Sequence, residues 1–346
     1  MIYPTIIIGS GLTGLTLAHK LISQGHQLLL IDKGRNAGGR LATKTIGHCI
    51  SDTGPGWFHT HDQITIPAVY AALNTIAAEP VLPEDLPACT LRDLPVTTSC
   101  QSWKIQGGIR RLTQELANPL EILQSMTLTK LKRSENSWVL EFKDNAHGDD
   151  PFEIQTQRLV LTMPWPQVLD LLKESELIDL ALNRTLPEIP DYERCIVGLF
   201  ETDMISDKFA DQDWFEPIGS PVLKLIRWQP GSNEKYSVTV LAQPEWSLQN
   251  LDSNPSESLL KLQDAASEVL EMNLQPTTSA IHRWKYAKLE PSPGLTSTPI
   301  VLSHSPFLMV AGEAFGYSPD FNSGILASQN SSNLASKQII SIPSEI

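Results

Sequence analysis

The most regular hydrophobic pattern lies within the first 32 residues of the chain. Thr5–Ile8 is a short apolar run rich in β-branched residues, which is typical of a strand buried on both faces. Apolar residues then recur at helical spacing from Leu15 to Ser23, and Gly25 stands where a glycine commonly ends a helix. Gln27–Ile31 is a second apolar run of strand length. The order of strand, turn, helix and strand predicts an α/β fold.

The rest of the pattern predicts a longer series of elements. Strands are expected at Trp138–Phe142, Arg158–Thr162, Cys195–Glu201, Val222–Trp228, Tyr236–Ala242 and Phe307–Val310. Helices are expected at Arg110–Leu116, Gln167–Lys173, Ser256–Met272 and from about Gly324 to Ile340. Residues 80–100 are rich in proline and acid and are expected to be irregular surface chain. The strand-like runs between residues 194 and 245 favour an antiparallel or mixed sheet.

Composition limits the classes of partner. The length of 346 residues suggests roughly two domains, and 26 basic against 39 acidic residues give a net charge of −13. This acidity disfavours nucleic acid and anionic lipid as partners, and no apolar run approaches the ~20 residues that span a bilayer. The four cysteines, at irregular spacing, are Cys49, Cys89, Cys100 and Cys195. With no signal peptide and no metal-ligand spacing, we expect a cytoplasmic protein with reduced thiols and no metal.

The turn after the first predicted strand has the sequence of a dinucleotide-binding loop. Gly9 permits a tight turn, Gly11 lets a pyrophosphate approach the backbone, and Gly14 lets the helix pack closely on the strand. Asp32 ends the second strand, where it can accept hydrogen bonds from a ribose. The expected contacts are Gly9, Gly11, Leu12, Thr13, Gly14 and Asp32. The alternative is a glycine-rich turn with only a structural role.

The segment after Asp32 carries a second signal. Residues 33–40 resemble the R-x-x-G-G-R segment of two-dinucleotide-fold flavoproteins, which lies against the FAD pyrophosphate. Arg35 or Arg40 can pair with phosphate oxygens, and a glycine lets the backbone come close. The residues that the resemblance adds to the cofactor site are Lys33, Arg35, Gly39 and Arg40. A solvated glycine turn with surface arginines is the alternative.

The C-terminal region resembles the closing flavin motif of the amine oxidase superfamily, G-[DE]…S-G-x-x-A-[AS]. The resemblance implies that Glu313 hydrogen-bonds the ribityl or pyrophosphate portion of FAD. It also implies that the final helix points its N-terminus at the isoalloxazine, where it would stabilise negative charge. The residues concerned are Gly312, Glu313, Ser323, Gly324 and Ile325. An ordinary buried helix with a serine cap remains possible for this segment alone.

Four internal sequence motifs narrow the resemblance to the renalase branch of that superfamily. Asp52–Phe58 resembles D-x-G-x-x-Y-F, Leu159–Pro164 with Gln167 resembles L-x-x-P-x-x-Q, Gln243–Ser247 resembles P-x-W-S, and His282–Ala287 resembles H-R-W-x-Y-A. Gly54 and Pro164 thereby join the expected cofactor contacts. The resemblance implies a two-dinucleotide-binding-fold flavoprotein: a Rossmann-like FAD domain (1–66, 101–166 and 287–346) and an α+β substrate domain on a mixed sheet (67–100 and 167–286).

Renalase-like enzymes oxidise isomeric dihydronicotinamides, passing a hydride to FAD and then electrons to oxygen. The resemblance therefore implies a small dihydronicotinamide-type substrate. We also expect a monomer or weak dimer. One departure is Gly56-Trp57, which stands where the family has a glutamine and a tyrosine. Because no cysteine follows Cys195, a thioether from a C-terminal cysteine cannot form, and FAD is expected to be held non-covalently.

The candidate pocket residues are Trp57, Trp246, His282 and Trp284. Hydride transfer to a flavin needs orientation more than acid–base groups, so a sparse catalytic set is expected. The alternative for each tryptophan is core packing, and for His282 a structural hydrogen bond. Two other classes stay open, namely a flavin amine oxidase or desaturase-like enzyme and a non-catalytic FAD-binding protein.

Overall fold

The computed structural model describes residues 2–95, 99–146, 148, 151–182, 191–204, 206–209, 212–290, 297–318, 321 and 323–341. The first sheet contains β1 (Ile2–Ile8), β2 (Leu29–Ile31), β8 (Ile122–Leu123), β9 (Met126–Arg133), β10 (Trp138–Asp144), β11 (Phe152–Leu161), β17 (Ile300–His304) and β18 (Phe307–Val310). The second contains β12 (Tyr192–Thr202), β13 (Trp214–Phe215), β14 (Leu223–Pro230), β15 (Tyr236–Ala242) and β16 (Thr278–Leu289). Two small sheets consist of β3 (Thr43–Ile46) with β4 (Cys49–Asp52), and of β5 (Phe58–His61), β6 (Glu79–Val81) and β7 (Cys100–Lys104).

The helices connect and cover these sheets. They are α1 (Leu12–Ser23), α2 (Pro67–Thr75), α3 (Ala88–Leu91), α4 (Arg110–Ala117), α5 (Trp165–Glu174), α6 (Asp179–Leu182), α7 (Pro244–Asn250), α8 (Pro255–Val269) and α9 (Gly324–Ile340). Short 3-10 turns lie at Pro83–Asp85, Asp207–Phe209 and Glu313–Phe315. None of the described helices is long and apolar enough to cross a membrane.

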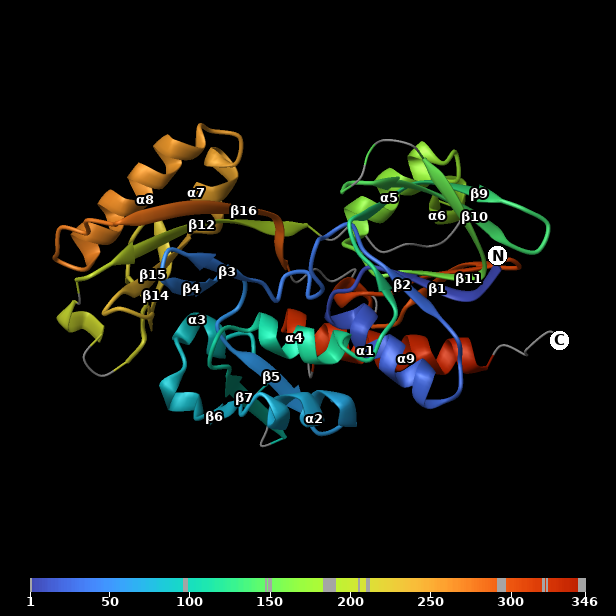
Figure 1. Cartoon of the computed structure of the whole chain (residues 1–346), viewed down its shortest axis with the longest axis horizontal. Coiled ribbons are helices and arrows are strands. Elements are labelled where there is room, and N and C mark those ends of the chain that lie inside the picture. The colour runs from blue at the N-terminus through green and yellow to red at the C-terminus, as the bar shows by residue number, and fades with distance from the viewer. Residues whose placement is uncertain are drawn as a thin grey trace.

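The first sheet has a parallel centre in the order β18-β11-β1-β2-β8. Its buried strands alternate between two cores, since Ile7 faces the helices α1, α4 and α9, whereas Ile6 and Ile8 face α5 and β10. Figure 1 shows these layers on the side of the molecule that carries both termini. Strand β18 comes from the end of the chain yet pairs with β11, so the last element of the sheet sits beside the middle of the sequence.

The second sheet is antiparallel, in the order β13-β14-β15-β12-β16. Helix α8 covers one face, where Leu262 and Ala266 pack against Ile196 and Val240. The β3–β4 hairpin covers the other face and lies between this sheet and the first one (Figure 1). A parallel Rossmann-like sheet with separate antiparallel sheets confirms the predicted α/β class.

Residues 80–100 differ from the irregular chain that their composition predicted. They contain β6, a 3-10 turn and α3, because β6 pairs with β7 from Glu79 to Val81. Pro80 lies on the short strand β6, Pro83 is the first residue of the 3-10 turn and Pro87 is the N-cap of α3, all positions where a missing N–H does no harm. Helix α2 shares its core with α1 and α4, whereas α3 lies near the second sheet. The domain boundaries implied by the resemblance stay a prediction.

His59 in β5 gives the fold a pH-dependent component. Its side chain is 5% exposed and its Nδ1 lies 3.0 Å from Ser102 Oγ, and burial lowers its pKa from 6.5 to about 4. Between these values the unfolded chain takes up a proton that the native state excludes. The free energy of unfolding therefore falls as the pH drops from about 6.5 to about 4, by about 1.4 kcal/mol per pH unit from this group.

Urea denaturation of the wild type and of His59→Gln at several pH values between 7 and 5 measures this contribution. The variant is expected to lose stability less steeply as the pH falls, by the slope stated above. The exposed His304 supplies the matched control, and His304→Gln is expected to follow the wild type. Equal slopes for all three proteins would contradict the assignment to His59.

Candidate functional site

The glycine turn between β1 and α1 has two kinds of glycine. Gly9 adopts φ +106° and donates its N–H to Ile31 O at 2.8 Å, while a Cβ on Gly14 would overlap Gly9 O. Gly11 has φ −72° and ψ −178°, a conformation open to any residue, and a Cβ there would meet no atom within 4 Å. Gly9 and Gly14 are therefore needed for packing, whereas Gly11 keeps the space before the N-terminus of α1 open. That end, where Leu12 and Thr13 begin the helix, has unpaired N–H groups that can bind an anion.

Asp32 is fixed by backbone donors from both sides. Its carboxylate accepts the N–H of Ser10 and the N–H of Gly34, each at 2.6 Å. A carboxylate has about four acceptor positions, so acceptors remain for a ribose. Ser10 Oγ is buried in the same turn and has no hydrogen-bond partner in the part of the chain that the structure describes. These polar groups fit a nucleotide ligand.

The 33–40 loop brings one of its three basic residues into the site. Lys33 and Arg35 are exposed, and Lys33 contacts Gln167 at 3.2 Å. Gly39 adopts φ +56° close to Gly11, so the loop lies directly against the glycine turn. Arg40 extends inward instead, where its Nη1 donates to Glu313 Oε1 at 2.5 Å. Burial disfavours the charge on Arg40, but the carboxylate of Glu313 outweighs it and raises the pKa of the guanidinium.

The closing motif lies where α9 begins. Ser323 Oγ accepts the N–H of Leu326 at 3.1 Å, which is the serine cap that the sequence allowed. The Glu313 carboxylate lies against Gly324, where a Cβ would come within 2.7 Å of Oε2. Glycine therefore lets the carboxylate reach the helix N-terminus. The Thr13 hydroxyl of α1 reaches the carbonyl of Ser328 in α9 at 3.4 Å, so the first and last motifs meet.

The remaining predicted cofactor contacts lie around this meeting point. Gly312 adopts φ +140°, and its N–H donates to Ser331 Oγ at 2.9 Å. The turn that ends at Pro164 passes beside it, since a Cβ on Gly312 would lie 3.6 Å from Thr162 O. Gly54 packs on the Arg40 backbone so closely that no side chain fits there. Ile325 is buried in the first turn of α9.

The four predicted pocket residues do not all lie together. Trp284 in β16 donates its indole N–H to Thr53 O at 2.6 Å, and its ring lies 4.3 Å from the His282 ring, edge on. Trp57 is 6% exposed and packs on the same face of the second sheet, where it shares the neighbour Leu241 with Trp284. Trp246 packs against the core beneath α8, on the opposite face. The structure thus brings His282 and Trp284 near the 52–57 loop, to which Trp57 belongs. Trp246 lies elsewhere.

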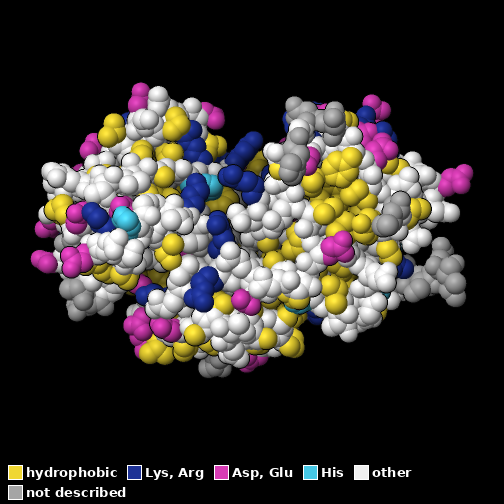
Figure 2. Space-filling view, viewed as in Figure 1, with side chains coloured by type: hydrophobic (Ala, Val, Ile, Leu, Met, Phe, Trp, Pro, Cys, Tyr) yellow, Lys and Arg dark blue, Asp and Glu magenta, His cyan; other side chains and the backbone are white. Residues whose placement is uncertain are grey.

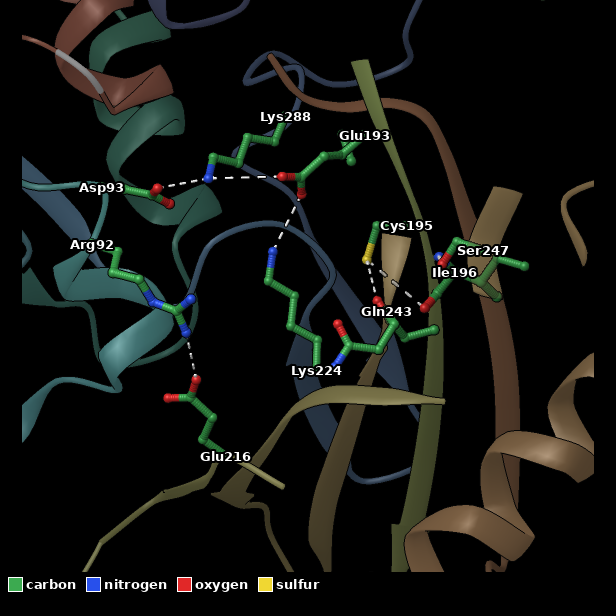
Figure 3. Close-up of polar contacts among 12 residues, drawn as sticks. Arg92, Asp93, Glu193, Cys195, Ile196, Glu216, Lys224, Gln243, Ser247 and Lys288 are labelled. Carbon is green, nitrogen blue, oxygen red and sulfur yellow. Dashed lines mark hydrogen bonds and ion pairs between the residues drawn. The ribbon is translucent and has the colours of Figure 1, made fainter. Parts of the chain in front are cut away.

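Ion pairs tie the α3 segment to the second sheet beside this face (Figure 3). Two pairs join this segment to the sheet region, Lys288–Asp93 at 2.6 Å and Arg92–Glu216 at 3.4 Å, while Lys224–Glu193 at 3.3 Å links β14 to β12 within the sheet. Lys288 also lies 3.9 Å from Glu193, which joins two of the pairs. The side chains of Lys224 and Lys288 are about two-thirds buried or more, so their charges are held by facing acids rather than by water.

Comparisons with known proteins agree with this arrangement. Residues 7–73 match the model of the NAD(P)-binding Rossmann-like domain. A cofactor-binding redesign of putrescine oxidase is 10% identical, with a TM-score of 0.66 over 99% of this chain and 100% of that one. A protein named as a protoporphyrinogen oxidase from Exiguobacterium sp. 255-15 is 14% identical, with a TM-score of 0.67 over 97% and 98%. A flavoprotein/dehydrogenase from Cytophaga hutchinsonii is 12% identical, with a TM-score of 0.56 over 99% and 80%.

The chain has the flavin amine oxidase fold. At these identities the likeness concerns the fold alone, so the chemistry must be argued from the side chains of this chain. Among the described residues, no group of three or more His, Cys, Asp or Glu side chains is arranged to hold a metal ion.

Within this flavin amine oxidase fold, sequence reasoning missed Arg227 in β14. The side chain is 5% exposed, and its Nη2 donates to the carbonyls of Asp52 at 2.5 Å and Gly54 at 2.9 Å. A Cβ on Gly56 would overlap the guanidinium, which explains why glycine stands there. Burial lowers the pKa of Arg227, and the carboxylate of Asp52 opposes that shift. The available signal was a charged residue, Arg227, inside the strand-like run Val222–Trp228.

Proposed function

We propose that this chain is an FAD-dependent oxidoreductase. The observation that carries the proposal is the convergence at one edge of the parallel sheet of the glycine turn, Asp32, and the N-terminus of α9 with Glu313. Two helix N-termini at one site suit a ligand with a pyrophosphate at one end and a group that gains negative charge at the other. The domain match over residues 7–73 and the flavoprotein among the structural neighbours support the same cofactor.

The residues present fit FAD. The open space before Gly11 suits a pyrophosphate, Asp32 keeps acceptors for a ribose, and the unpartnered Ser10 hydroxyl lies between them. Arg40 follows Gly39, which lies against this turn, and its guanidinium stays charged beside Glu313. With no cysteine after Cys195, we propose that the cofactor is held non-covalently. When bound, FAD would accept a hydride from the substrate and pass the electrons to oxygen.

We further propose a renalase-like substrate, a dihydronicotinamide isomeric with NAD(P)H. Support comes from the four internal sequence motifs and from the chemistry of the face of the second sheet that carries Trp57, His282 and Trp284. Burial and the charge of Lys44 lower the pKa of His282 to about 4, so its imidazole is neutral at pH 7 and is not poised as a proton donor. Trp57 and Trp284 offer apolar ring surfaces for orienting a planar substrate and excluding water. Orientation without acid–base catalysis is what hydride transfer requires.

Amine oxidation is the second candidate, because putrescine oxidase shares the fold. A non-catalytic FAD protein is the third, since Gly56-Trp57 replaces the family's amide and phenol. We also propose that the protein acts in the cytoplasm and that it is a monomer or weak dimer.

Anaerobic mixing of the FAD-loaded protein with candidate reductants separates these functions. We expect α-NADH or the 2- and 6-dihydro isomers to bleach the visible flavin absorbance within seconds, and putrescine or benzylamine to leave it unchanged. Dithionite serves as the control that the bound flavin can be reduced. Bleaching by amines alone would contradict the proposed dihydronicotinamide substrate and would favour an amine oxidase. Bleaching by dithionite only would favour the non-catalytic protein.

A further inference from the structure

Three basic residues from distant parts of the sequence lie near one another between the two large sheets. Lys44 comes from β3, Arg110 is the first residue of α4, and His282 lies in β16. The N–H of Arg110 donates to Thr43 Oγ1 at 3.0 Å, which ties the start of α4 to β3. Figure 2 shows basic side chains and a histidine gathered in the hollow between the two lobes, where β3, β16 and α4 lie in Figure 1.

The strand register explains why Lys44 faces His282. Ile46 lies on the side of the β3–β4 hairpin that packs on the second sheet, against Val197 and Leu199. Residues two apart on a strand share a face, so Lys44 lies on that side too. Val197 pairs with His282 across β12 and β16, which puts the histidine at the same part of the sheet.

The three groups are close enough to influence one another. Burial and the charge of Arg110 lower the pKa of Lys44, and burial and the charge of Lys44 lower that of His282. The cluster therefore carries two cations and a neutral imidazole at pH 7. Bringing like charges together in a half-buried place is unfavourable unless something negative joins them.

No acid of the described chain neutralises this cluster. Neither Lys44 nor Arg110 forms an ion pair with any described residue, and His282 Nε2 is buried without a hydrogen-bond partner there. Four other basic side chains near the domain junction are paired. They are Arg40 with Glu313, Lys104 with Asp213, Lys224 with Glu193, and Lys288 with Asp93. Lys44 and Arg110 thus differ from these paired side chains, because they have no acidic partner among the described residues although the chain has a net charge of −13.

We propose that Lys44, Arg110 and His282 form a subsite for a phosphoryl group of the substrate. The proposal rests on the proposed function and adds which donors the enzyme prefers, namely phosphorylated nucleotides over the unphosphorylated riboside. An ammonium, a planar guanidinium and an imidazole N–H can each donate to one of the three terminal oxygens of a phosphate. Two cations beside the substrate also disfavour the ammonium group of an amine.

The subsite is separate from the dinucleotide cradle. Arg40 of the cradle donates to the carbonyls of Tyr286 at 3.3 Å and Ala287 at 3.4 Å, further along β16. Four or five residues of strand separate these carbonyls from His282, which corresponds to about 13–17 Å. One phosphate cannot span that distance. The glycine turn at Gly11 and the cluster at Lys44 are therefore two separate candidate anion sites.

The test compares FAD-loaded wild type with Lys44→Met and Arg110→Met. The donors are an isomeric dihydronicotinamide riboside, the corresponding mononucleotide and the dinucleotide, and anaerobic flavin reduction gives an apparent Kd for each. We expect each variant to bind the two phosphorylated donors about tenfold more weakly or worse, and the riboside within about twofold of the wild type. Lys285→Met is the matched control, because Lys285 is an exposed lysine on the same strand. It is expected to bind all three donors as the wild type does.

A second readout does not depend on turnover. Inorganic pyrophosphate is expected to raise the Tm of the FAD-loaded wild type and of Lys285→Met, but not that of Lys44→Met. If pyrophosphate acts in this way while no dihydronicotinamide bleaches the flavin, the subsite stands and the proposed function fails. If the variants lose affinity for the riboside as much as for the mononucleotide, the subsite is wrong although the function stands. Loss of bound FAD from Lys44→Met would also overturn the proposal, because the cluster would then serve the cofactor.

Discussion

A Gly11→Val variant is expected to fold normally and to purify without bound flavin. The backbone at Gly11 has φ −72° and ψ −178°, which valine adopts without strain, and its Cβ would meet no protein atom within 4 Å. The added methyl groups would instead fill the space before the N-terminus of α1, where the pyrophosphate is proposed to lie. The ratio of visible to ultraviolet absorbance measures FAD content, and far-ultraviolet circular dichroism measures folding.

Two further variants calibrate this result. Gly11→Ala, with one methyl group, is expected to retain FAD with intermediate affinity in reconstitution titrations. Gly14→Val is expected to lose FAD together with the fold, because its Cβ would overlap the carbonyl of Gly9. A Gly11→Val protein that carries a full complement of FAD would contradict the position proposed for the pyrophosphate.

Arg227→Met is expected to lower the free energy of unfolding by about 3–5 kcal/mol, the usual effect of leaving a buried charge without its compensating group. The substitution leaves the carbonyls of Asp52 and Gly54 without their shared donor. It also leaves the Asp52 carboxyl, which is 3% exposed, without the guanidinium that opposes its desolvation. Burial already raises the pKa of Asp52, so the loss of a favourable charge adds to an existing cost. Urea denaturation of the FAD-loaded protein measures the effect.

Removing the Asp52 carboxylate as well should restore part of the lost free energy of unfolding. The double variant Asp52→Asn with Arg227→Met is expected to be more stable than Arg227→Met alone, because no unpaired charge remains buried. Arg227→Lys is expected to be intermediate, since an ammonium keeps the charge but not the planar fork that reaches two carbonyls. If the free energy of unfolding of Arg227→Met lies within about 1 kcal/mol of the wild-type value, the guanidinium does not stabilise the 52–57 loop.

The elements that the sequence predicted well are those with a local signal. Thr5–Ile8 and Phe307–Val310 are continuous apolar runs, and Leu15–Ser23 has helical spacing; the two runs form parallel strands of the first sheet, and the helix α1 connects β1 to β2. The final helix begins at Gly324 as expected, because a serine cap precedes it. Local patterns failed for residues 80–100, where pairing with β7 rather than composition creates a strand.

The parts of the candidate site that the sequence did not reveal depend on tertiary contacts. Arg227 meets Asp52 across 175 residues, and no local rule connects them. Trp246 looked equivalent to Trp284 as an aromatic side chain, yet the two pack on opposite faces of one sheet. Lys44, Arg110 and His282 belong to three elements whose meeting depends on the order of the folded layers. Side-chain type was readable in advance, but the face on which each side chain lies was not.

The chain order of the first sheet has a consequence for biosynthesis. Gly9 is translated about 300 residues before Glu313, which at about 5–20 residues per second corresponds to a delay of about 15–60 s. During that time β11 lacks its neighbour β18, and α1 lacks the contact between Thr13 and Ser328. The exposed edge of a parallel sheet must then be protected while the ribosome completes the polypeptide. The site proposed for the flavin is therefore complete only after the C-terminal residues have been synthesised.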